Sequence, residues 1–354
     1  MKTSRHLFLL ALSFSWQTVH GDEVTVSSLR ESLDSQVVET RRAAALKLGS
    51  LKQLADPAFP DLAQATKDED PVVAARAVQA LTQNRSNRDG VVGVWLEALE
   101  SPHASVRIAA AESIGRTRPR QIEAILGRLI QALEDDNPLV AVAVSNALAR
   151  LDFRKYPEGK EQLVKAAKPL LQSEDSRIQS AGAGMLAWQK AGVEEALPIL
   201  THLLKSPSRR VRRDSIGSIQ RFGPLAIAAV PAVLENLESL DEVDRQYAGR
   251  ALLSIDPENA VTTLSEILQQ SRVQLAREGA VRALALVDSE PARNAVANAL
   301  RDRSANVRYF ACHAILRSGK AGESAAENLR YILSKDRNSI VKELAGEALG
   351  ILGQ

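Results

Sequence analysis

The sequence predicts an all-α fold, an α–α superhelix (solenoid) of about ten stacked helical hairpins. Two observations predict it. A unit of about 33 residues recurs along almost the whole chain, which is the spacing of helical repeat proteins. Within each unit, apolar residues fall at the spacing of one face of an α-helix. No run of alternating polar and apolar residues indicates a strand.

The clearest copy of the unit runs from Asp302 to Gly319. Its Val307, Ala311 and Ile315 share one helix face, together with Phe310 and Ala314. Gly319 follows the last apolar residue, where glycine commonly ends a helix. We use the position of Val307 as the marker of each repeat.

Ten marker positions lie 31 to 38 residues apart. They are Thr40, Val73, Val106, Val140, Ile178, Val211, Asp244, Ala276, Val307 and Val341. Small residues predominate four positions after the marker, and Leu or Ile stands eight positions after it. We predict that both positions are buried between helices.

A second amphipathic helix precedes each marker helix. Several of these first helices begin with proline, which suits a first turn because its missing N–H needs no partner there. We assign this role to Pro60, Pro198, Pro231 and Pro291. Each unit is therefore a helix, a short polar turn and a second helix.

These residues resemble the HEAT-repeat family, in particular the bacterial lyase-like HEAT repeats. The pattern D-x-x-x-x-V-R-x-x-A-x-x-A-L carries the resemblance, which covers roughly residues 25 to 354. The best copies are Asp302/Val307/Arg308/Ala311/Ala314/Ile315 and Asp336/Val341/Lys342/Ala345/Ala348/Leu349. The resemblance implies a fold but no particular function, because packing residues define the family.

In such repeats the residue after the marker and the preceding Asp form a ladder between adjacent units. The resemblance therefore implies a structural role for a recurrent basic residue. In this chain it is Arg41, Arg107, Arg212, Arg245, Arg277, Arg308 and Lys342. Ala74 and Ala141 take its place in two repeats, where we expect weaker joints.

Residues 1–21 differ from the rest. Lys2 and Arg5 precede a ten-residue apolar run, and Val19 and Gly21 are small enough for a signal-peptidase site. We expect a signal peptide over residues 1–21, cleavage near Gly21, and an exported chain, periplasmic or secreted. The run is too short to span a membrane, so we expect no transmembrane span in the mature chain, 22–354.

Charge and cysteine content exclude some classes. The net charge is +2, and without residues 1–21 the side chains hold 43 basic and 43 acidic groups. This balance gives no strong nucleic-acid signal. The single cysteine, Cys312, excludes an internal disulfide, and its equivalents are small apolar residues. We expect Cys312 to be a packed hydrophobic residue.

One spacer is longer than the others. It lies near residues 152–161 and lengthens its repeat to 38 residues. Pro157 and Gly159 predict a loop there. We interpret it as a bulge within one solenoid, 22–354, and not as a domain boundary.

Solenoids usually bind partners on their concave face. In this register that face holds the residues two and six positions after each marker. The predicted partner-binding residues are Arg213, Gln246, Arg250, Arg282, Tyr309 and His313. Tyrosine and arginine are common anchors of protein interfaces, so we expect a protein or peptide partner there.

Two other functions remain open. A basic cluster that contains Arg209, Arg210 and Arg213 could bind a polyanion. A lyase-like HEAT enzyme or enzyme subunit is the second, similar to bilin lyases or to deoxyhypusine hydroxylases. The hydroxylases hold two irons with His-Glu pairs, yet none of the five histidines here precedes Glu. We predict no catalytic, metal or cofactor site, and favour a non-catalytic protein-binding scaffold.

Overall fold

The computed structural model describes residues 25–83, 87–119, 121–322 and 324–353. Over these residues the chain is built from α-helices and short 3-10 segments, without strands, which confirms the all-α prediction. It divides into two compact units, Met1–Asn87 and Arg88–Gln354, and each is described by itself. The predicted signal peptide, 1–21, lies outside the described residues.

Unit 1 holds two helical hairpins. Its helices are α1 (Val26–Leu33), α2 (Val38–Ser50), η1 (Lys52–Ala58), α3 (Phe59–Ala65), α4 (Pro71–Ala80) and η2 (Leu81–Gln83). The marker helices α2 and α4 pack on each other, and α1 packs on α3. Each hairpin therefore buries its face on the next, as a solenoid requires.

Unit 2 continues the pattern with eight hairpins among its described residues. The first helices are α5 (Arg88–Ala98), α7 (Ile122–Gln131), α9 (Glu158–Leu171), α11 (Val193–Leu203), α13 (Val230–Asn236), α15 (Ala260–Gln270), α17 (Glu290–Ala299) and α19 (Ala325–Lys335). The second helices are α6 (Ala104–Thr117), α8 (Pro138–Arg150), α10 (Ser176–Gln189), α12 (Arg209–Phe222), α14 (Glu242–Ile255), α16 (Gln274–Leu284), α18 (Ala305–Ser318) and α20 (Ser339–Ile351). Three 3-10 segments interrupt the hairpins: η3 (Ala132–Glu134), η4 (Phe153–Lys155) and η5 (Gly223–Ala229).

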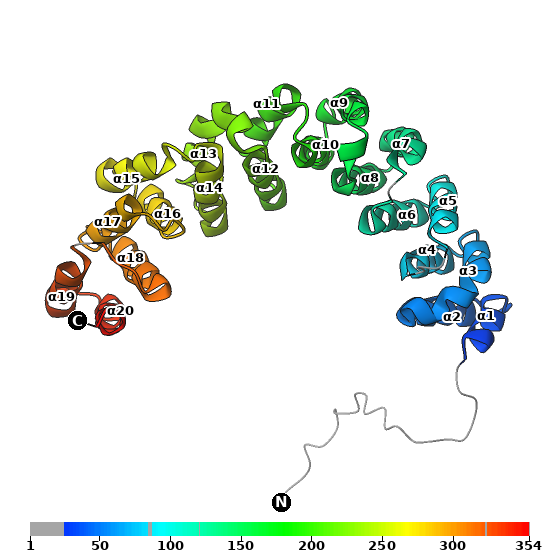
Figure 1. Cartoon of the computed structure of the whole chain (residues 1–354), viewed down its shortest axis with the longest axis horizontal. Helices are drawn as coiled ribbons and strands as arrows, with labels where there is room; N and C mark the ends of the chain where they lie inside the picture. The colour runs from blue at the N-terminus through cyan, green and yellow to red at the C-terminus, as the bar shows by residue number, and fades with distance from the viewer. Residues whose placement is uncertain (1–24, 84–86, 120, 323, 354) are drawn as a thin grey trace, which may run out of the picture. The chain divides into compact units, whose positions relative to one another are not determined.

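The second helices of unit 2 form a row of their own. Each packs on the next, from α6 through to α20, and in Figure 1 they lie along one side of this unit while the first helices lie along the other. Glycines permit close approach in this row: a Cβ at Gly115 would lie 2.9 Å from the Cα of Ala147, and a Cβ at Gly249 would lie 2.6 Å from the Cβ of Ala283. We call the solvent-facing side of this row the second-helix face.

The predicted core register is confirmed. Every residue four or eight positions after a marker is buried, from Ala44 and Leu48 in the first repeat to Ala345 and Leu349 in the last. Gly319 takes the predicted left-handed conformation at the end of α18, with φ +63°. The apolar spacing therefore predicted the contacts between hairpins.

Two details of the prediction are wrong. Pro198 lies inside α11 and not at its start, because the helix begins five residues earlier at Val193. The spacer is more ordered than a loop: Phe153 is buried in η4, and α9 already begins at Glu158.

The recurrent arginines form the ladder that the resemblance implied. Four of them bind the Asp that precedes the next marker: the closest N–O distances are 2.7 Å for Arg41–Asp68, 2.6 Å for Arg107–Asp135, 2.7 Å for Arg277–Asp302 and 2.6 Å for Arg308–Asp336. The Nη1 group of each also donates to the backbone carbonyl six residues earlier. Each arginine therefore links its own turn to the turn of the next hairpin.

Two further rungs use displaced carboxylates. The next repeat has Ser239 or Ser271 where the Asp would stand, so Arg212 binds the marker residue Asp244 at 2.7 Å, and Arg245 binds Glu278 at 3.4 Å. Asp244 is fully buried. Asp244 is charged at a position where other repeats have Val, and its ion pair with Arg212 explains how the charge is tolerated.

The joint between α8 and α10 has a different link. Its ladder positions hold Ala141 and Ser173, neither of which carries a charge. The buried Gln189 instead donates from Nε2 to the carbonyls of Leu148, Ala149 and Leu151 at 3.0, 2.9 and 3.1 Å. This amide satisfies carbonyls at the end of α8, which a helix end otherwise leaves without partners.

The ladder carboxylates predict loss of stability in acid. Burial raises the pKa of Asp336, but hydrogen bonds from Arg308 and from the Asn338 N–H outweigh it and leave that pKa below its ordinary value. A lowered folded-state pKa stabilises the fold at pH values above the unfolded pKa of about 3.9, and this stabilisation is lost as the pH falls. We expect a flat free energy of unfolding above about pH 5 and a decline below that.

The Asp336→Asn variant tests the cause of that decline. Urea denaturation at several pH values should show a less stable variant at pH 7 and a shallower loss below about pH 4, because the titrating group is gone. An acid decline identical to that of the unaltered chain would contradict the assignment to this rung.

One stretch of unit 2 has the length and hydropathy of a membrane span. It is Arg209–Asn236, and 44% of its most apolar window is buried inside the protein. The stretch is not one straight helix: α12 ends at Phe222, its C-cap Gly223 has a φ of +61°, and η5 and α13 follow. Val211, Ile219 and Val233 are buried in the packed hairpin, whereas Leu225 and Ile227 are exposed.

Candidate functional site

Five of the six predicted partner-binding residues line one hollow on the second-helix face. Gln246 and Arg250 come from α14, Arg282 from α16, and Tyr309 and His313 from α18. The hollow has a volume of about 330 Å³ and is also lined by Glu242, Ala283, Ala285, Leu286, Phe310, Ala314 and Arg317. We call it the α14–α18 groove.

Arg282 on α16 links the two neighbouring helices, α14 and α18, at one wall of this groove. Its Nη1 binds Glu242 Oε1 at 2.6 Å, and its guanidinium lies over the Phe310 ring, 4.4 Å from the centroid. The hydrogen bond from Arg282 lowers the pKa of Glu242, which therefore stays ionised. An arginine fixed by a carboxylate and a ring is rigid, so this wall is preorganised.

Aromatic rings from α18 form a second wall. Tyr309 meets Phe310 edge to face, with ring centroids 5.2 Å apart, and stacks on His313 at 6.2 Å. Tyr309 and Phe310 are half-buried, and His313 is exposed. Half-buried aromatic rings supply large contact area at low cost in conformational entropy.

The groove is basic. Arg250 and Arg317 are exposed, and neither has an acidic partner within the described part of the chain. With Arg282 and Glu242 included, the lining carries three guanidiniums and one carboxylate, a net charge of +2. A partner group of negative charge suits this lining.

Arg213, the sixth predicted residue, lies outside the groove. Its guanidinium binds Asp241 at 3.2 Å and Asp244 at 3.3 Å, across the joint between α12 and α14. The repeat pattern predicted the position of Arg213 on its helix. It did not predict the ion pair with Asp244, because a marker position usually holds an apolar residue. Arg213 strengthens this joint beside the Arg212 rung.

The other basic residues around Arg213, namely Lys205, Arg209 and Arg210, also pair with acidic residues. The closest N–O distances are 2.9 Å for Lys205–Glu235, 3.0 Å for Arg209–Asp241 and 3.6 Å for Arg210–Asp214. Arg212 and Arg213 pair as described above. This neutralisation weakens the field that a polyanion site at Arg209, Arg210 and Arg213 requires.

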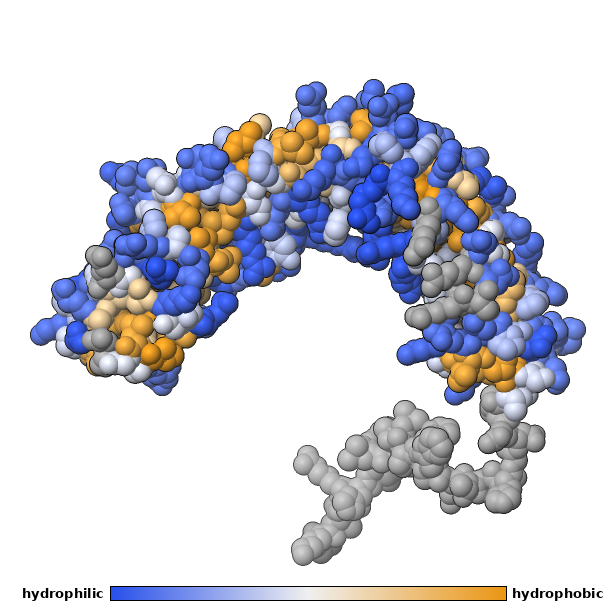
Figure 2. Space-filling view, viewed as in Figure 1, coloured by the Kyte–Doolittle hydropathy of each residue, from blue (hydrophilic) through white to orange (hydrophobic). Residues whose placement is uncertain are grey.

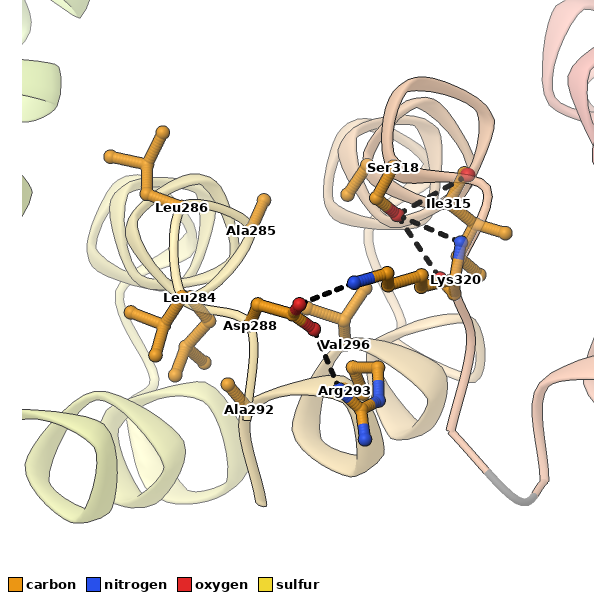
Figure 3. Close-up of a pocket in the computed structure, with 12 residues that line it drawn as sticks. Leu284, Ala285, Leu286, Asp288, Ala292, Arg293, Val296, Ile315, Ser318 and Lys320 are labelled. Carbon is orange, nitrogen blue, oxygen red and sulfur yellow. Dashed lines mark hydrogen bonds and ion pairs between the residues drawn. The ribbon is translucent and has the colours of Figure 1, made fainter. Parts of the chain in front are cut away.

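A smaller hollow, which the repeat pattern does not predict, adjoins the groove (Figure 3). Its volume is about 160 Å³, and it lies where α16 and α18 end. The lining is Leu284, Ala285, Leu286, Val287, Asp288, Ala292, Arg293, Val296, Ala314, Ile315, Ser318 and Lys320. We call it the α16–α18 pit. These residues become neighbours through both the helix register and the conformation of the turns, and the repeat pattern predicts only the first.

Ion pairs close one side of this pit. Asp288 accepts hydrogen bonds from Lys320 and from Arg293, the latter at 2.7 Å (Figure 3). Lys320 first, and then Arg293, lower the pKa of Asp288. The remaining walls are mainly aliphatic, and Figure 2 shows apolar residues gathered over this part of unit 2 within a hydrophilic surround.

The described residues contain no group of three or more His, Cys, Asp or Glu side chains placed to hold a metal ion. His313 belongs to the groove, where its neighbours are aromatic and basic.

Cys312 is expected to be chemically inert in the folded chain. It is fully buried, and burial followed by the charge of Asp336 raises the pKa of its thiol to about 12. Because the thiolate is the reactive form, we expect no alkylation by iodoacetamide at pH 8 and complete alkylation in urea, measured by mass spectrometry. Reaction of the folded chain at the rate of a free thiol would show that Cys312 faces solvent.

The chain belongs to the HEAT-repeat family. The HEAT-repeat family model matches residues 92–169, 128–220 and 261–350, which together cover more than half of the sequence. A search of curated protein sequences finds no match. The family assignment confirms the resemblance and the solenoid architecture.

Solved structures with the same fold include Kap95 and Kap121p. The Kap95:Nup1 complex has a TM-score of 0.63 at 16% identity, and covers 92% of this chain and 51% of Kap95. Kap121p bound to Ste12p has a TM-score of 0.61 at 13% identity, with 92% and 41% covered. The chain thus spans about half the length of these relatives, and the likeness concerns the fold.

A third similar structure is the complex of CpcE and CpcF of phycocyanin lyase from Nostoc sp. PCC7120. It shares 21% identity, with a TM-score of 0.44, and covers 77% of this chain and 98% of the matched chain.

Proposed function

We propose that this protein is a non-catalytic scaffold that binds a protein partner through the α14–α18 groove. The observation that carries the proposal is the gathering of Gln246, Arg250, Arg282, Tyr309 and His313 around one hollow. They come from three helices that follow one another in the row of second helices. A partner seated there contacts three repeats at once, as is usual for solenoids.

The chemistry of the lining supports a protein partner. Tyr309 and Phe310 provide half-buried rings, and Arg250 and Arg317 provide guanidiniums that lack a described acidic partner. Tyrosine and arginine are enriched among residues that dominate binding energy. The HEAT-fold structures similar to this chain include Kap95 with Nup1 and Kap121p with Ste12p.

Affinity capture tests this proposal. The full chain is immobilised and incubated with extract of its source cells, in parallel with a Tyr309→Ala/Arg250→Ala variant. A matched control is Tyr331→Ala/Arg337→Ala, which removes an exposed tyrosine and an exposed arginine elsewhere in unit 2. We expect a protein retained by the unaltered chain and the control but lost by the first variant. Equal retention by all three chains would refute the groove as the binding site.

We also propose that the scaffold works in an exported compartment. Support comes from residues 1–21, where two basic residues, an apolar run and the small residues Val19 and Gly21 follow one another. Mass spectrometry of the chain purified from its source should find Asp22 as the first residue. A chain that retains Met1 in the cytoplasm would refute export without affecting the groove.

A further inference from the structure

We propose that the α14–α18 groove and the α16–α18 pit form one two-part site. In this site the partner's binding segment is an acidic peptide with a bulky apolar side chain. This inference rests on the proposed function and adds the chemistry of the partner. The groove takes the carboxylates, and the pit takes the apolar side chain.

The two hollows adjoin each other. Both are lined by Ala285, Leu286 and Ala314, so one wall of the groove is also a wall of the pit. Leu286 is 45% exposed, which is high for a leucine in a packed repeat. An extended segment that crosses Leu286 and Ala314 reaches both hollows without a change in the protein.

The pit suits one apolar side chain. Leu284, Val287, Val296 and Ile315 line it, and its volume is about 160 Å³. An apolar cavity of about 150 Å³ is large enough to hold benzene, so a leucine or phenylalanine side chain fits. Asp288 is already bound by Arg293 and Lys320, which leaves no free carboxylate there to attract a cation.

The charge of the combined site favours carboxylates. Its lining holds five cationic side chains (Arg250, Arg282, Arg293, Arg317 and Lys320) and two acids (Glu242 and Asp288), a net charge of +3. The chain as a whole carries only +2. Arg250 and Arg317 have no acidic partner among the described residues, and a planar guanidinium matches a carboxylate with two hydrogen bonds.

An acidic peptide fits better than a nucleic acid. Both supply negative charge, but only a peptide also supplies an aliphatic side chain for the pit. The basic cluster around Arg209 and Arg213 is paired with acids: both bind Asp241, and Arg213 also binds Asp244. The guanidiniums of Arg250 and Arg317 lie instead in a groove that adjoins an apolar hollow, a combination that suits a peptide.

Fluorescence anisotropy with short labelled peptides tests the proposal on the full chain. The probe peptide carries a cluster of Asp and Glu next to one Leu, in either order. One comparison peptide has Ala in place of Leu, a second has Asn and Gln in place of the acids, and a labelled oligothymidylate represents single-stranded nucleic acid. We expect both peptide changes to weaken binding by roughly tenfold, and the oligonucleotide to bind more weakly than the probe.

Variants assign each half of the site. Arg250→Ala/Arg317→Ala should abolish the preference for the acidic peptide over the neutral one. Ala314→Leu, which fills the border between the hollows, should abolish the preference for Leu over Ala. The matched control is Arg116→Ala/Arg150→Ala, which removes exposed arginines from the same helix position as Arg317 in two earlier repeats. Thermal melting checks that each variant is folded.

Three results would overturn this inference: equal binding of all peptides, tighter binding of the oligonucleotide, or a loss of selectivity in the Arg116/Arg150 control. The proposed function is judged separately. If the captured partner is lost by the Tyr309/Arg250 variant although no acidic peptide binds, the scaffold stands and the acidic partner is wrong. If capture is also unaffected by that variant, both proposals fail.

Discussion

Arg277→Ala is expected to lower the free energy of unfolding by about 3–5 kcal/mol. Arg277 donates from Nε and Nη2 to Asp302 at 2.7 and 3.0 Å, and from Nη1 to the Ser271 carbonyl at 2.9 Å. The side chains of the pair are 3% and 8% exposed. Removal of the guanidinium leaves the buried carboxylate of Asp302 without its counterion, which is costly, while the Ser271 carbonyl keeps a hydrogen bond from Arg303 Nη2 at 3.1 Å.

A matched control separates burial from ion pairing as such. Arg154 and Asp152 form a pair of similar length, 2.6 Å, but their side chains are 88% and 53% exposed. Arg154→Ala should therefore change the stability far less than Arg277→Ala does, because solvent screens an exposed pair. Urea denaturation followed by circular dichroism measures both variants, and hydrogen exchange of α16 and α18 locates the loss. Equal costs would mean that the ladder does not tie the hairpins together.

Phe153→Ala is expected to lower the free energy of unfolding by a similar amount, about 3–5 kcal/mol. The ring is fully buried in η4, and a Cβ on Gly159 would lie only 2.7 Å from it. Truncation leaves a cavity between η4 and the start of α9, because a glycine cannot fill the space. This result would establish the long spacer as part of the packed core.

An exposed aromatic residue provides the comparison. Trp188 is 55% exposed, and its main described partner is the guanidinium of Arg221, 4.2 Å from its ring centroid. Trp188→Ala should cost about 0.5–1 kcal/mol, the value of an exposed cation–π contact. If thermal and urea denaturation show Phe153→Ala to be as mild as Trp188→Ala, the spacer is a loop after all.

The sequence predicted the core because one physical requirement repeats ten times. Each hairpin must bury its face on its neighbour, so residues such as Ala311 and Ile315 recur at fixed distances from the marker. The spacer escaped this reasoning because it occurs once. Pro157 and Gly159 have turn-forming chemistry, yet the buried Phe153 turns this segment into part of the core.

The candidate site was predictable only where it depends on helix geometry. Counting two and six residues from the marker identified Tyr309, Arg282 and Arg250 as a shared surface, because helix geometry projects these positions to one side. Counting could not show that Arg213 is held by Asp241 and Asp244. Nor could it show the pit, since the turns after α16 and α18 differ from repeat to repeat.

Site-specific photo-crosslinking tests the central claim most directly. Benzoylphenylalanine is placed in the full chain either at Tyr309, in the groove, or at Tyr331, an exposed tyrosine on α19 that lies outside it. Both chains are irradiated in the source cells, and the products are identified by mass spectrometry. We expect one protein crosslinked at position 309 and absent at position 331. The same crosslinked protein at both positions, or at 331 alone, would contradict a binding site on the second-helix face.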